Sequence, residues 1–219
     1  MTQPDLNATD RHARMAAICA LAPVVPVLLV DRVEDAVPLA KALTAGGLPV
    51  LEVTLRTEAA LDVIRAMREG CPDAVVGVGT LRTKADVSAA LEAGAQFGVS
   101  PGVLPEILDA AEEKNFALLP GTATPSEMMF AAGEGYRILK LFPAEMVGGL
   151  PLIKAVSSPL ADLKFCPTGG IDAKRAVDYL AQPNVVCVGG SWVAPRAMVD
   201  GGDWAGIQAL AAEAAALAR

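Results

Sequence analysis

One repeating unit runs through most of the 219-residue chain. Each unit is a short β-branched apolar run, then a turn, then an alanine-rich amphipathic stretch, and finally glycine or proline. Apolar runs as continuous as these are typical of parallel strands that are covered on both faces. We therefore predict eight strands, at residues 24–30, 50–54, 74–78, 97–99, 117–119, 136–141, 163–166 and 185–188.

The stretches between these strands carry the start and stop signals of helices. Thr57 and Thr83 stand where N-caps are expected, and Asp86 lies in the first turn of the helix that Thr83 would cap. Glycine follows several of the stretches. The predicted helices span residues 34–45, 58–69, 84–93, 106–115, 126–132, 150–157, 173–181 and 204–217.

Eight successive strand–helix units favour a closed (β/α)8 barrel, the TIM barrel of the α/β class. A doubly wound open sheet is the alternative, but the order of units shows no obvious switch point. No linker divides the chain, so we expect a single domain over residues 1–219. Within it, residues 1–22 would form an N-terminal extension with an extra helix, and residues 23–219 the barrel. Active-site residues of such barrels lie at the C-terminal ends of the strands.

Charge and hydropathy exclude two classes of partner. The formal net charge is -7 without a basic cluster, so we expect no nucleic-acid binding. An apolar run at residues 15–30 follows Arg11 and Arg14, but a bilayer span needs about 20 apolar residues. Pro23 and Pro26 also interrupt this run. We therefore expect neither a membrane span nor a signal peptide, but a short helix followed by the first strand.

The cysteines and the histidine bear on compartment and metal binding. The four cysteines form no CxxC pair, and Cys166 and Cys187 fall in apolar strand-like runs, so we expect reduced thiols and a cytoplasmic protein. The single histidine, His12, precedes the barrel. Because a zinc site needs several ligands and no carboxylate cluster suggests magnesium, we expect no metal. The same lone histidine argues against a Ser-His-Asp triad, and His12 is interpreted as a solvated helix residue.

Two lysines lie on predicted strands, Lys140 and Lys164. Lys164 is near the start of its strand, at the end of the barrel that carries no active site, so we interpret it as structural. Lys140 is near the end of its strand among apolar neighbours, where burial should lower its pKa. A free amine at that position can attack a carbonyl. The residues alone leave open an alternative, in which Lys140 forms a structural ion pair.

A row of polar side chains ends the strand at residues 50–54. Strand alternation puts Glu52, Thr54 and Arg56 on one face, where they would need polar partners inside a barrel. As a site, Glu52 would transfer protons and Arg56 would grip a carboxylate. The alternative is a mutual Glu52–Arg56 ion pair. Thr80 ends another strand, after Val76 and Val78 of the same parity, and its hydroxyl should join this group.

Glycine pairs follow the last two predicted strands. They lie in the segments 167–172, Pro-Thr-Gly-Gly-Ile-Asp, and 189–192, Gly-Gly-Ser-Trp. Barrel enzymes often bind phosphate at these two loops through backbone N–H groups and helix N-termini. A single glycine pair usually marks only a turn, whereas two at these loops indicate a phosphate site. Together with Lys140 they predict a phosphorylated carbonyl substrate.

As an ordered set, seven stretches resemble the family of 2-keto-3-deoxy-6-phosphogluconate (KDPG) aldolases, which includes 4-hydroxy-2-oxoglutarate (KHG) aldolases. The resemblance covers about residues 24–192. One departure is Leu141, where the family commonly has an aromatic residue; its parity directs it to the helix layer, away from Lys140. The matching stretches are residues 51–57, 79–80, 100–102, 120–121, 140 with 142–145, 167–171 and 189–192.

The resemblance implies a metal-free, cofactor-free class I aldolase that assembles as a homotrimer and splits KDPG into pyruvate and glyceraldehyde 3-phosphate. Lys140 would form the imine with the C2 carbonyl, and Glu52 would be the general acid and base. The implied binding residues are Arg56 and Thr80 for the pyruvate carboxylate, Pro101 in the same pocket, Thr168 for the aldehyde-side hydroxyls, and Gly169, Gly170, Gly190 and Ser191 for the phosphate.

Other functions stay open from the sequence. The substrate could instead be KHG or the 6-phosphogalactonate analogue, because spacing does not fix stereochemistry. A phosphate-binding isomerase barrel would use Lys140 only as a charge. A non-catalytic sugar-phosphate binder is disfavoured by the combination of Lys140, Glu52 and Arg56, since a binder needs no desolvated lysine.

Overall fold

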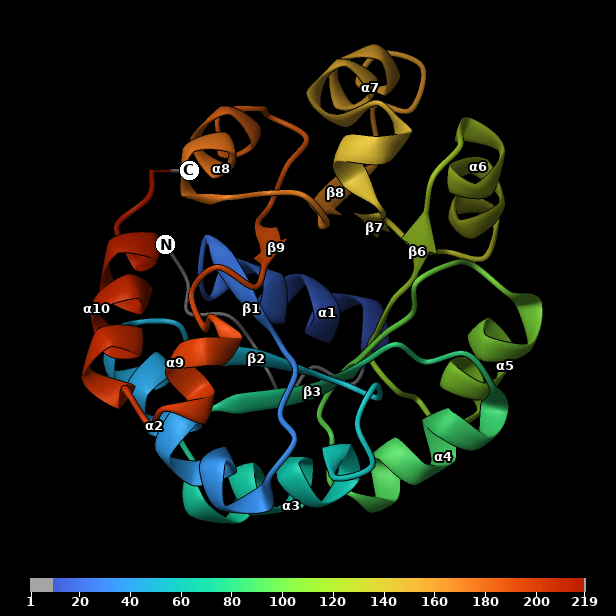
Figure 1. Ribbon diagram of the computed structural model, residues 1–219. Coiled ribbons are helices and arrows are strands. Elements are labelled where there is room, and N and C mark those ends of the chain that lie inside the picture. Colours follow the sequence, from blue (N-terminus) through green and yellow to red (C-terminus); the bar gives the residue numbers. More distant parts are fainter. Residues whose placement is uncertain (1–9, 219) are drawn as a thin grey trace.

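The computed structural model describes residues 10–218, in which helices surround a set of short parallel strands (Figure 1). In chain order the elements are α1 (Arg11–Ala20), β1 (Val24–Leu28), η1 (Val33–Asp35), α2 (Ala36–Ala45), β2 (Val50–Thr54), α3 (Ala60–Gly70), β3 (Val75–Gly79), α4 (Lys84–Glu92), β4 (Gly98–Val99), α5 (Pro105–Glu113), β5 (Leu118–Leu119), β6 (Gly121–Thr122), α6 (Pro125–Gly133), β7 (Ile138–Leu141), η2 (Ala144–Val147), α7 (Gly149–Val156), β8 (Lys164–Pro167), α8 (Ala173–Leu180), β9 (Val188–Gly190), α9 (Arg196–Asp200) and α10 (Trp204–Ala215).

Every strand pairing is parallel. One sheet has the order β5-β4-β3-β2-β1-β9 and a second has the order β6-β7-β8. Between β5 and β6 lies only Pro120, whose carbonyl accepts from Lys140 N at 2.9 Å. Isolated bridges join Phe165 to Val185 and Thr168 to Gly189. The strands thus form a curled parallel sheet with helices on its outer side (Figure 1).

Two apolar clusters lie on opposite faces of the curled sheet. The larger one lies between strands and surrounding helices and includes Leu51 and Val53 of β2. The smaller one lies on the opposite, inner face and includes Val25, Val50 and Phe97. Alternation along each strand therefore sorts side chains into helix-facing and inner sets, as expected for a sheet whose two faces are both buried.

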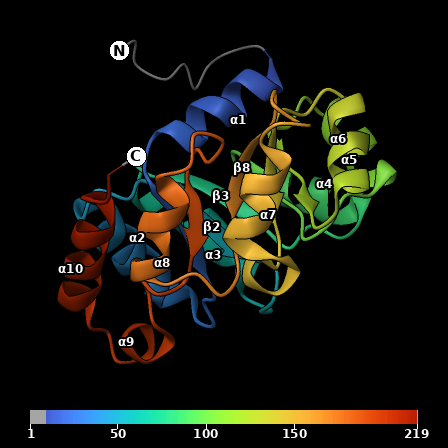
Figure 2. The same cartoon turned by 90° about the horizontal axis from the view of Figure 1, so that it is seen from above.

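Helix α1 covers the end at which the strands begin. Its residues Met15, Ile18 and Cys19 join the inner cluster, and Figure 2 shows α1 across one end of the molecule with α9 at the opposite end. The predicted N-terminal helix is thus present, while residues 1–9 of the predicted extension lie outside the described residues. The prediction that His12 is solvated is wrong, since it is half-buried, with its ring edge-on to Tyr136 at 4.8 Å.

The predicted helices and strands are present, with boundary shifts of a few residues. Thr83 and Asp86 form the predicted cap at α4, as a full capping box. The prediction that Thr57 caps α3 is wrong: Ala59 holds the cap position, and Thr57 Oγ1 donates instead to the Val30 carbonyl at 2.7 Å. The sequence pattern did not predict η2, α9 or the short strand β6.

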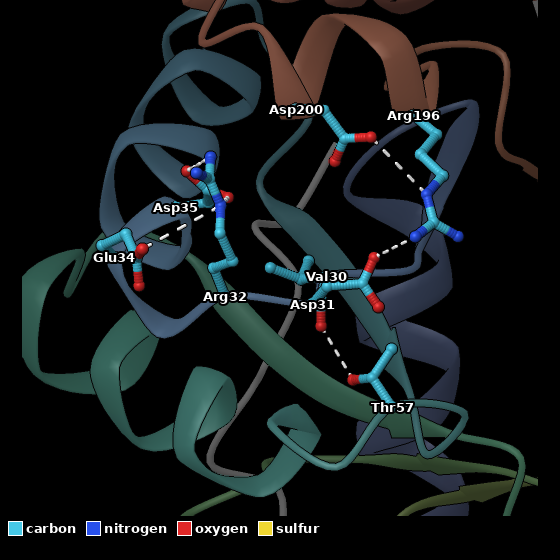
Figure 3. Close-up of polar contacts among 8 residues, drawn as sticks. All are labelled: Val30, Asp31, Arg32, Glu34, Asp35, Thr57, Arg196 and Asp200. Atoms are coloured by element: carbon cyan, nitrogen blue, oxygen red, sulfur yellow. Dashed lines mark hydrogen bonds and ion pairs between the residues drawn. The ribbon is translucent and has the colours of Figure 1, made fainter.

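Hydrogen bonds and ion pairs join the loops after β1, β2 and β9 (Figure 3). Arg196 of α9 pairs with Asp31, in the loop after β1, at 2.6 Å, and within α9 with Asp200 at 3.6 Å. The Thr57–Val30 bond links the loops after β2 and β1. Exposed pairs of this kind contribute only about 0–1 kcal/mol each, so they orient the loops more than they stabilise the fold. None of the helices within residues 10–218 is long and apolar enough to span a membrane.

Candidate active site

Lys140 and Glu52 meet on the inner side of the strands. Lys140 comes from β7 and Glu52 from β2, two strands in different sheets, and Lys140 Nζ lies 3.2 Å from Glu52 Oε1. Only 7% and 4% of the two side chains are exposed. The Phe142 ring centroid lies 5.1 Å from Nζ, within cation–π range. A buried amine thus has one acidic partner and one aromatic neighbour.

Two strand glycines, Gly79 and Gly189, leave room for the polar side chains of Glu52 and Thr168. A Cβ added at Gly79 of β3 would lie 2.3 Å from Glu52 Oε1, and one at Gly189 of β9 would lie 2.2 Å from Thr168 Oγ1. Contacts this short do not occur between real atoms, so either side chain would have to move. The strand glycines therefore allow Glu52 and Thr168 to stand inside the curled sheet.

A cavity of about 250 Å³ opens above the Lys140–Glu52 pair. Arg56 enters it from the loop after β2, and its Nε donates to Thr54 Oγ1 at 3.1 Å, while Thr54 Oγ1 donates to the Leu28 carbonyl at 2.8 Å. Six of the predicted site residues line this cavity: Glu52, Arg56, Thr80, Pro101, Lys140 and Thr168.

Thr80 lies at this cavity for a different reason from the one predicted. Val76 and Val78 face the helix layer, so strand parity would have directed Thr80 outward. Instead β3 ends at Gly79, and Thr80 takes a left-handed backbone conformation with φ of 67°. A positive φ is uncommon for a residue with a branched Cβ and is strained. The turn, and not strand alternation, brings Thr80 to the site.

A second cavity of about 160 Å³ adjoins the first. The two share Val27, Arg56, Phe142 and Thr168. Gly169 and Gly170 have positive φ values, of 103° and 77°, which only glycine adopts readily. The remaining predicted residues line this second cavity: Gly169, Gly170, Gly190 and Ser191. The structure thus brings every predicted site residue to one continuous region.

Three residues that line the first cavity were not assigned a role from the sequence: Val27, Thr54 and Phe142. Val27 could have been found from strand parity, since Val25, two residues earlier, is in the inner cluster. Thr54 was identified as facing inward, but its link to Arg56 depends on a loop geometry that no pattern encodes. Phe142 was seen only as part of a matching stretch, because an aromatic residue at a strand end has many structural explanations.

The surroundings limit the chemistry of the pair. Cys166 lies opposite Lys140 in the β7–β8 register. A hydrogen bond with Cys187, followed by burial, raises the pKa of the Cys166 thiol well above its usual range, so it is neutral. Glu52 is therefore the ionisable acid that contacts Lys140. Within residues 10–218 no group of three or more His, Cys, Asp or Glu side chains could hold a metal ion.

This geometry separates the alternatives left open by the sequence. The Glu52–Arg56 ion pair is not formed among the described residues, because Glu52 contacts Lys140 and Arg56 contacts Thr54. A Lys140–acid pair is present, but it faces a cavity instead of packed side chains. An amine with an adjacent carboxylate, next to a cationic side chain and a glycine-lined cavity, suits imine chemistry on an anionic carbonyl compound.

Comparison with known proteins agrees with imine chemistry at this site. The model of the KDPG and KHG aldolase family matches residues 15–210. The 2-dehydro-3-deoxy-phosphogluconate aldolase of Pseudoalteromonas atlantica is 51% identical over 89% of this chain and 90% of its own.

Two solved structures are similar to the whole fold. The KDPG aldolase of Legionella pneumophila, with pyruvate captured as a covalent carbinolamine, has a TM-score of 0.90 and 42% identity over 92% of this chain and 98% of its own. The Zymomonas mobilis KDPG aldolase with 3-phosphoglycerate has a TM-score of 0.90 and 46% identity over 95% and 98% of the two chains.

Proposed function

The chain belongs to the KDPG and KHG aldolase family, and from this premise we propose that it cleaves KDPG reversibly to pyruvate and glyceraldehyde 3-phosphate. It does so as a class I aldolase, through a lysine imine and without a metal or cofactor. The observation that carries the proposal is the buried Lys140–Glu52 pair, which opens into one cavity that adjoins a second, glycine-lined cavity.

Lys140 is the proposed nucleophile. Its amine adds to the C2 carbonyl to give a carbinolamine, and loss of water gives the protonated imine. The imine draws electrons from the C3–C4 bond, which breaks to an enamine as the C4 hydroxyl loses its proton and becomes the aldehyde. Protonation of the enamine at C3 and hydrolysis then release pyruvate and restore the amine.

Glu52 is the proposed acid and base for these steps. Its carboxylate lies 3.2 Å from Lys140 Nζ, within hydrogen-bond reach of atoms attached to that nitrogen. One carboxylate over the imine can take the C4 hydroxyl proton and later deliver a proton to C3. Glu52 also compensates the charge of a protonated Lys140 or imine in a site with little solvent.

The remaining residues bind the two charged ends of the substrate in this proposal. Arg56 and Thr80 hold the carboxylate, with Pro101 against the same half of the molecule, and Thr168 contacts the hydroxyls of the aldehyde half. Backbone groups of the glycine loops suit a phosphate, which binds well to N–H groups that no side chain shields. The proposed phosphate residues are Gly169, Gly170, Gly190 and Ser191.

The glycine-lined cavity favours a phosphorylated substrate over KHG. KHG ends in a second carboxylate and is shorter, so it would leave that cavity partly unused. The 6-phosphogalactonate analogue differs only in stereochemistry and stays a candidate. The ratio of kcat/KM values for the three compounds ranks them, and a higher value for KHG would contradict the assignment of KDPG.

We further propose that the curled sheet closes into a (β/α)8 barrel, with β5 and β6 as one strand interrupted at Pro120 and α1 as the extra helix. The Phe165–Val185 and Thr168–Gly189 bridges, which join β8 and the residue after it to β9 and the segment before it, support this closure. We treat residues 1–219 as one domain, with the extension at 1–22.

Homotrimer formation and a cytoplasmic location are also proposals. Exposed apolar side chains such as Met129, Phe130 and Met146 are of the kind that subunit contacts bury. The four cysteines are buried and none is in a disulfide, as suits a reducing compartment. Size-exclusion chromatography with light scattering measures the mass of the assembly, and a monomeric mass would contradict the trimer.

Intact-mass measurement after borohydride reduction with pyruvate tests the mechanism. Wild type should gain one reduced pyruvate, and Lys140→Ala should gain none. Without an adduct on wild type, the chain is a phosphate-binding barrel without imine chemistry, such as an isomerase. An adduct that persists in Lys140→Ala would move the nucleophile to another lysine, with Lys164 next in line. Lys164 is at the start of β8, with its Nζ donating to the Pro183 carbonyl.

A further inference from the structure

Glu145 follows the nucleophile strand but points away from both substrate cavities. It lies in η2, and it lines neither cavity. Instead Tyr179 Oη donates to its Oε1, and Arg175 Nε lies 3.2 Å from its Oε2. Both partners belong to α8, the helix that follows the Gly169–Gly170 loop. A separate cavity of about 340 Å³ borders these three side chains.

Two backbone N–H groups of η2 and the Arg175 guanidinium of α8 hold three successive carbonyls of that loop. Ala144 N donates to the Thr168 carbonyl at 2.8 Å, and Glu145 N donates to the Gly169 carbonyl at 3.2 Å. Arg175 Nη1 donates to the Gly170 carbonyl at 3.4 Å. In a trans peptide the carbonyl and the next residue's N–H point in opposite directions. Holding these carbonyls from behind therefore directs the N–H groups of residues 169–171 to the other side of the loop.

Packing makes the arrangement specific to Glu145. A Cβ at Gly170 would lie 2.9 Å from Glu145 Cβ, so the loop rests directly on this side chain. Tyr179 is buried, and only 29% of the Glu145 side chain is exposed. Burial, and next the hydrogen bond to Glu145, raise the pKa of Tyr179, so its hydroxyl stays a donor. Bonds to a carboxylate are stronger than neutral ones, which suits a fixed orientation.

We propose that Glu145, clamped by Tyr179 and Arg175, is a positioning residue that sets the Gly169–Gly170 loop to bind the substrate phosphate. The proposal rests on the proposed function. It implies that the chain segment carrying Lys140 also supports the phosphate end of the site, so that nucleophile and phosphate are held at a fixed separation. Glu145 itself touches no substrate atom.

Steady-state kinetics on two substrates test this role in the full-length protein. In Glu145→Gln and Tyr179→Phe, the KM for KDPG should rise about three- to tenfold, the effect of losing one or two hydrogen bonds, with kcat within twofold. The KM for unphosphorylated KHG and the rate of borohydride trapping with pyruvate should stay at wild-type values. Arg65→Ala is the matched control, because it removes an exposed arginine ion pair on α3 and should change neither KM.

Two results would overturn the proposal. An unchanged KM for KDPG in both variants would show that the loop needs no support from Glu145. Equal losses with KDPG and KHG, together with a lower melting temperature, would show a merely structural role. Calorimetric titration with inorganic phosphate separates this proposal from the proposed function: wild type should bind phosphate more tightly than Glu145→Gln even if KDPG proves not to be the substrate.

Discussion

The two ends of the strands differ in almost every physical respect. At the N-terminal end, Val25, Val50 and Phe97 pack under α1 in an apolar cluster. At the C-terminal end, Glu52 and Lys140 face a cavity. Val50 and Glu52 are on the same face of β2, separated by about 7 Å of strand at 3.3 Å per residue. A step of two residues along a single strand thus leads from the apolar cluster to the polar site.

The comparison teaches how one small interior serves both stability and reactivity. The apolar end is closed by a helix, so it supplies buried area and excludes water from below the site. The polar end carries groups that would be costly to bury anywhere else and that are satisfied by one another. Substitutions at the two ends should therefore affect different quantities: the free energy of unfolding at one end and the catalytic constants at the other.

The largest expected effect is at the polar end, in Glu52→Gln. The amide keeps the shape of the side chain but cannot transfer protons, so kcat for KDPG cleavage should fall about 10²- to 10⁴-fold. A coupled assay of pyruvate release at saturating KDPG measures the change. Val50→Ala, on the same face of β2, is the control and should lower stability while leaving kcat near wild type. A Glu52→Gln variant with half the wild-type kcat would refute the role of Glu52.

The next effect compares one substitution at two positions of β3. Gly79→Ala would put a Cβ 2.3 Å from Glu52 Oε1, and Gly77→Ala would put one 2.4 Å from the Phe97 ring. Displacing the acid by about an ångström should lower kcat by up to about 10²-fold. Overpacking the apolar end should instead cost about 1–3 kcal/mol of unfolding free energy, with kcat preserved.

Urea unfolding and kinetics on both glycine variants decide whether the two ends are separable. If Gly77→Ala lowered kcat as much as Gly79→Ala, the apolar cluster would be transmitting strain to the site and the separation would be lost. If Gly79→Ala lost stability but kept its activity, Glu52 would have an alternative position from which it still works.

A smaller effect is expected at the polar end from Thr54→Val, at the last residue of β2. Thr54 Oγ1 accepts from Arg56 Nε and donates to the Leu28 carbonyl, and valine offers neither bond. With its guanidinium no longer fixed, Arg56 should bind the carboxylate less well, and KM should rise about three- to tenfold. Thr54→Ser keeps the hydroxyl and should restore KM. Equal KM values for the valine and serine variants would show that Arg56 needs no orientation by residue 54.

The sequence predicts the strands and helices well because burial on both faces and helix amphipathicity leave strong local patterns. It predicts β9 less well. The pattern ends at the last valine, Val188, whereas the strand continues through Gly189 and Gly190. Those glycines are required by tertiary space, since a Cβ would collide with Thr168 or Trp192. Propensity carries no information about such contacts.

The site residues likewise divide into those that local sequence patterns predict and those that depend on tertiary contacts. Lys140, Glu52 and Arg56 were predicted because strand ends and parity place them. The position of Thr80 was right but its stated reason was wrong, because a left-handed turn overrides parity after Gly79. Glu145 stands in a matching stretch, but the sequence indicates no clamp, since the clamp needs α8 to lie against η2. Local patterns thus predict which residues reach the site, while contacts between loops decide how they are held.

The smallest predicted effect concerns pH at the apolar end. Burial, and next the charge of Arg11, lower the pKa of His12, with Arg137 acting the same way and Asp10 and Glu112 opposing. The unfolded chain therefore binds a proton at His12 more readily than the folded chain. Stability should be complete above the unfolded pKa of about 6.5 and decline as the pH falls below it. His12→Gln should lose less stability than wild type between pH 7 and pH 5.

Urea midpoints at several pH values, together with kcat at each, test this last difference between the ends. The loss is modest because His12 is only half-buried and solvent screens its charge. Since His12 and α1 lie at the end remote from Lys140, the variant and wild type should show the same pH profile of kcat. If the urea midpoints of the two proteins changed with pH by the same amount, His12 would be solvated after all. If the pH profile of kcat differed between them, α1 would influence the site.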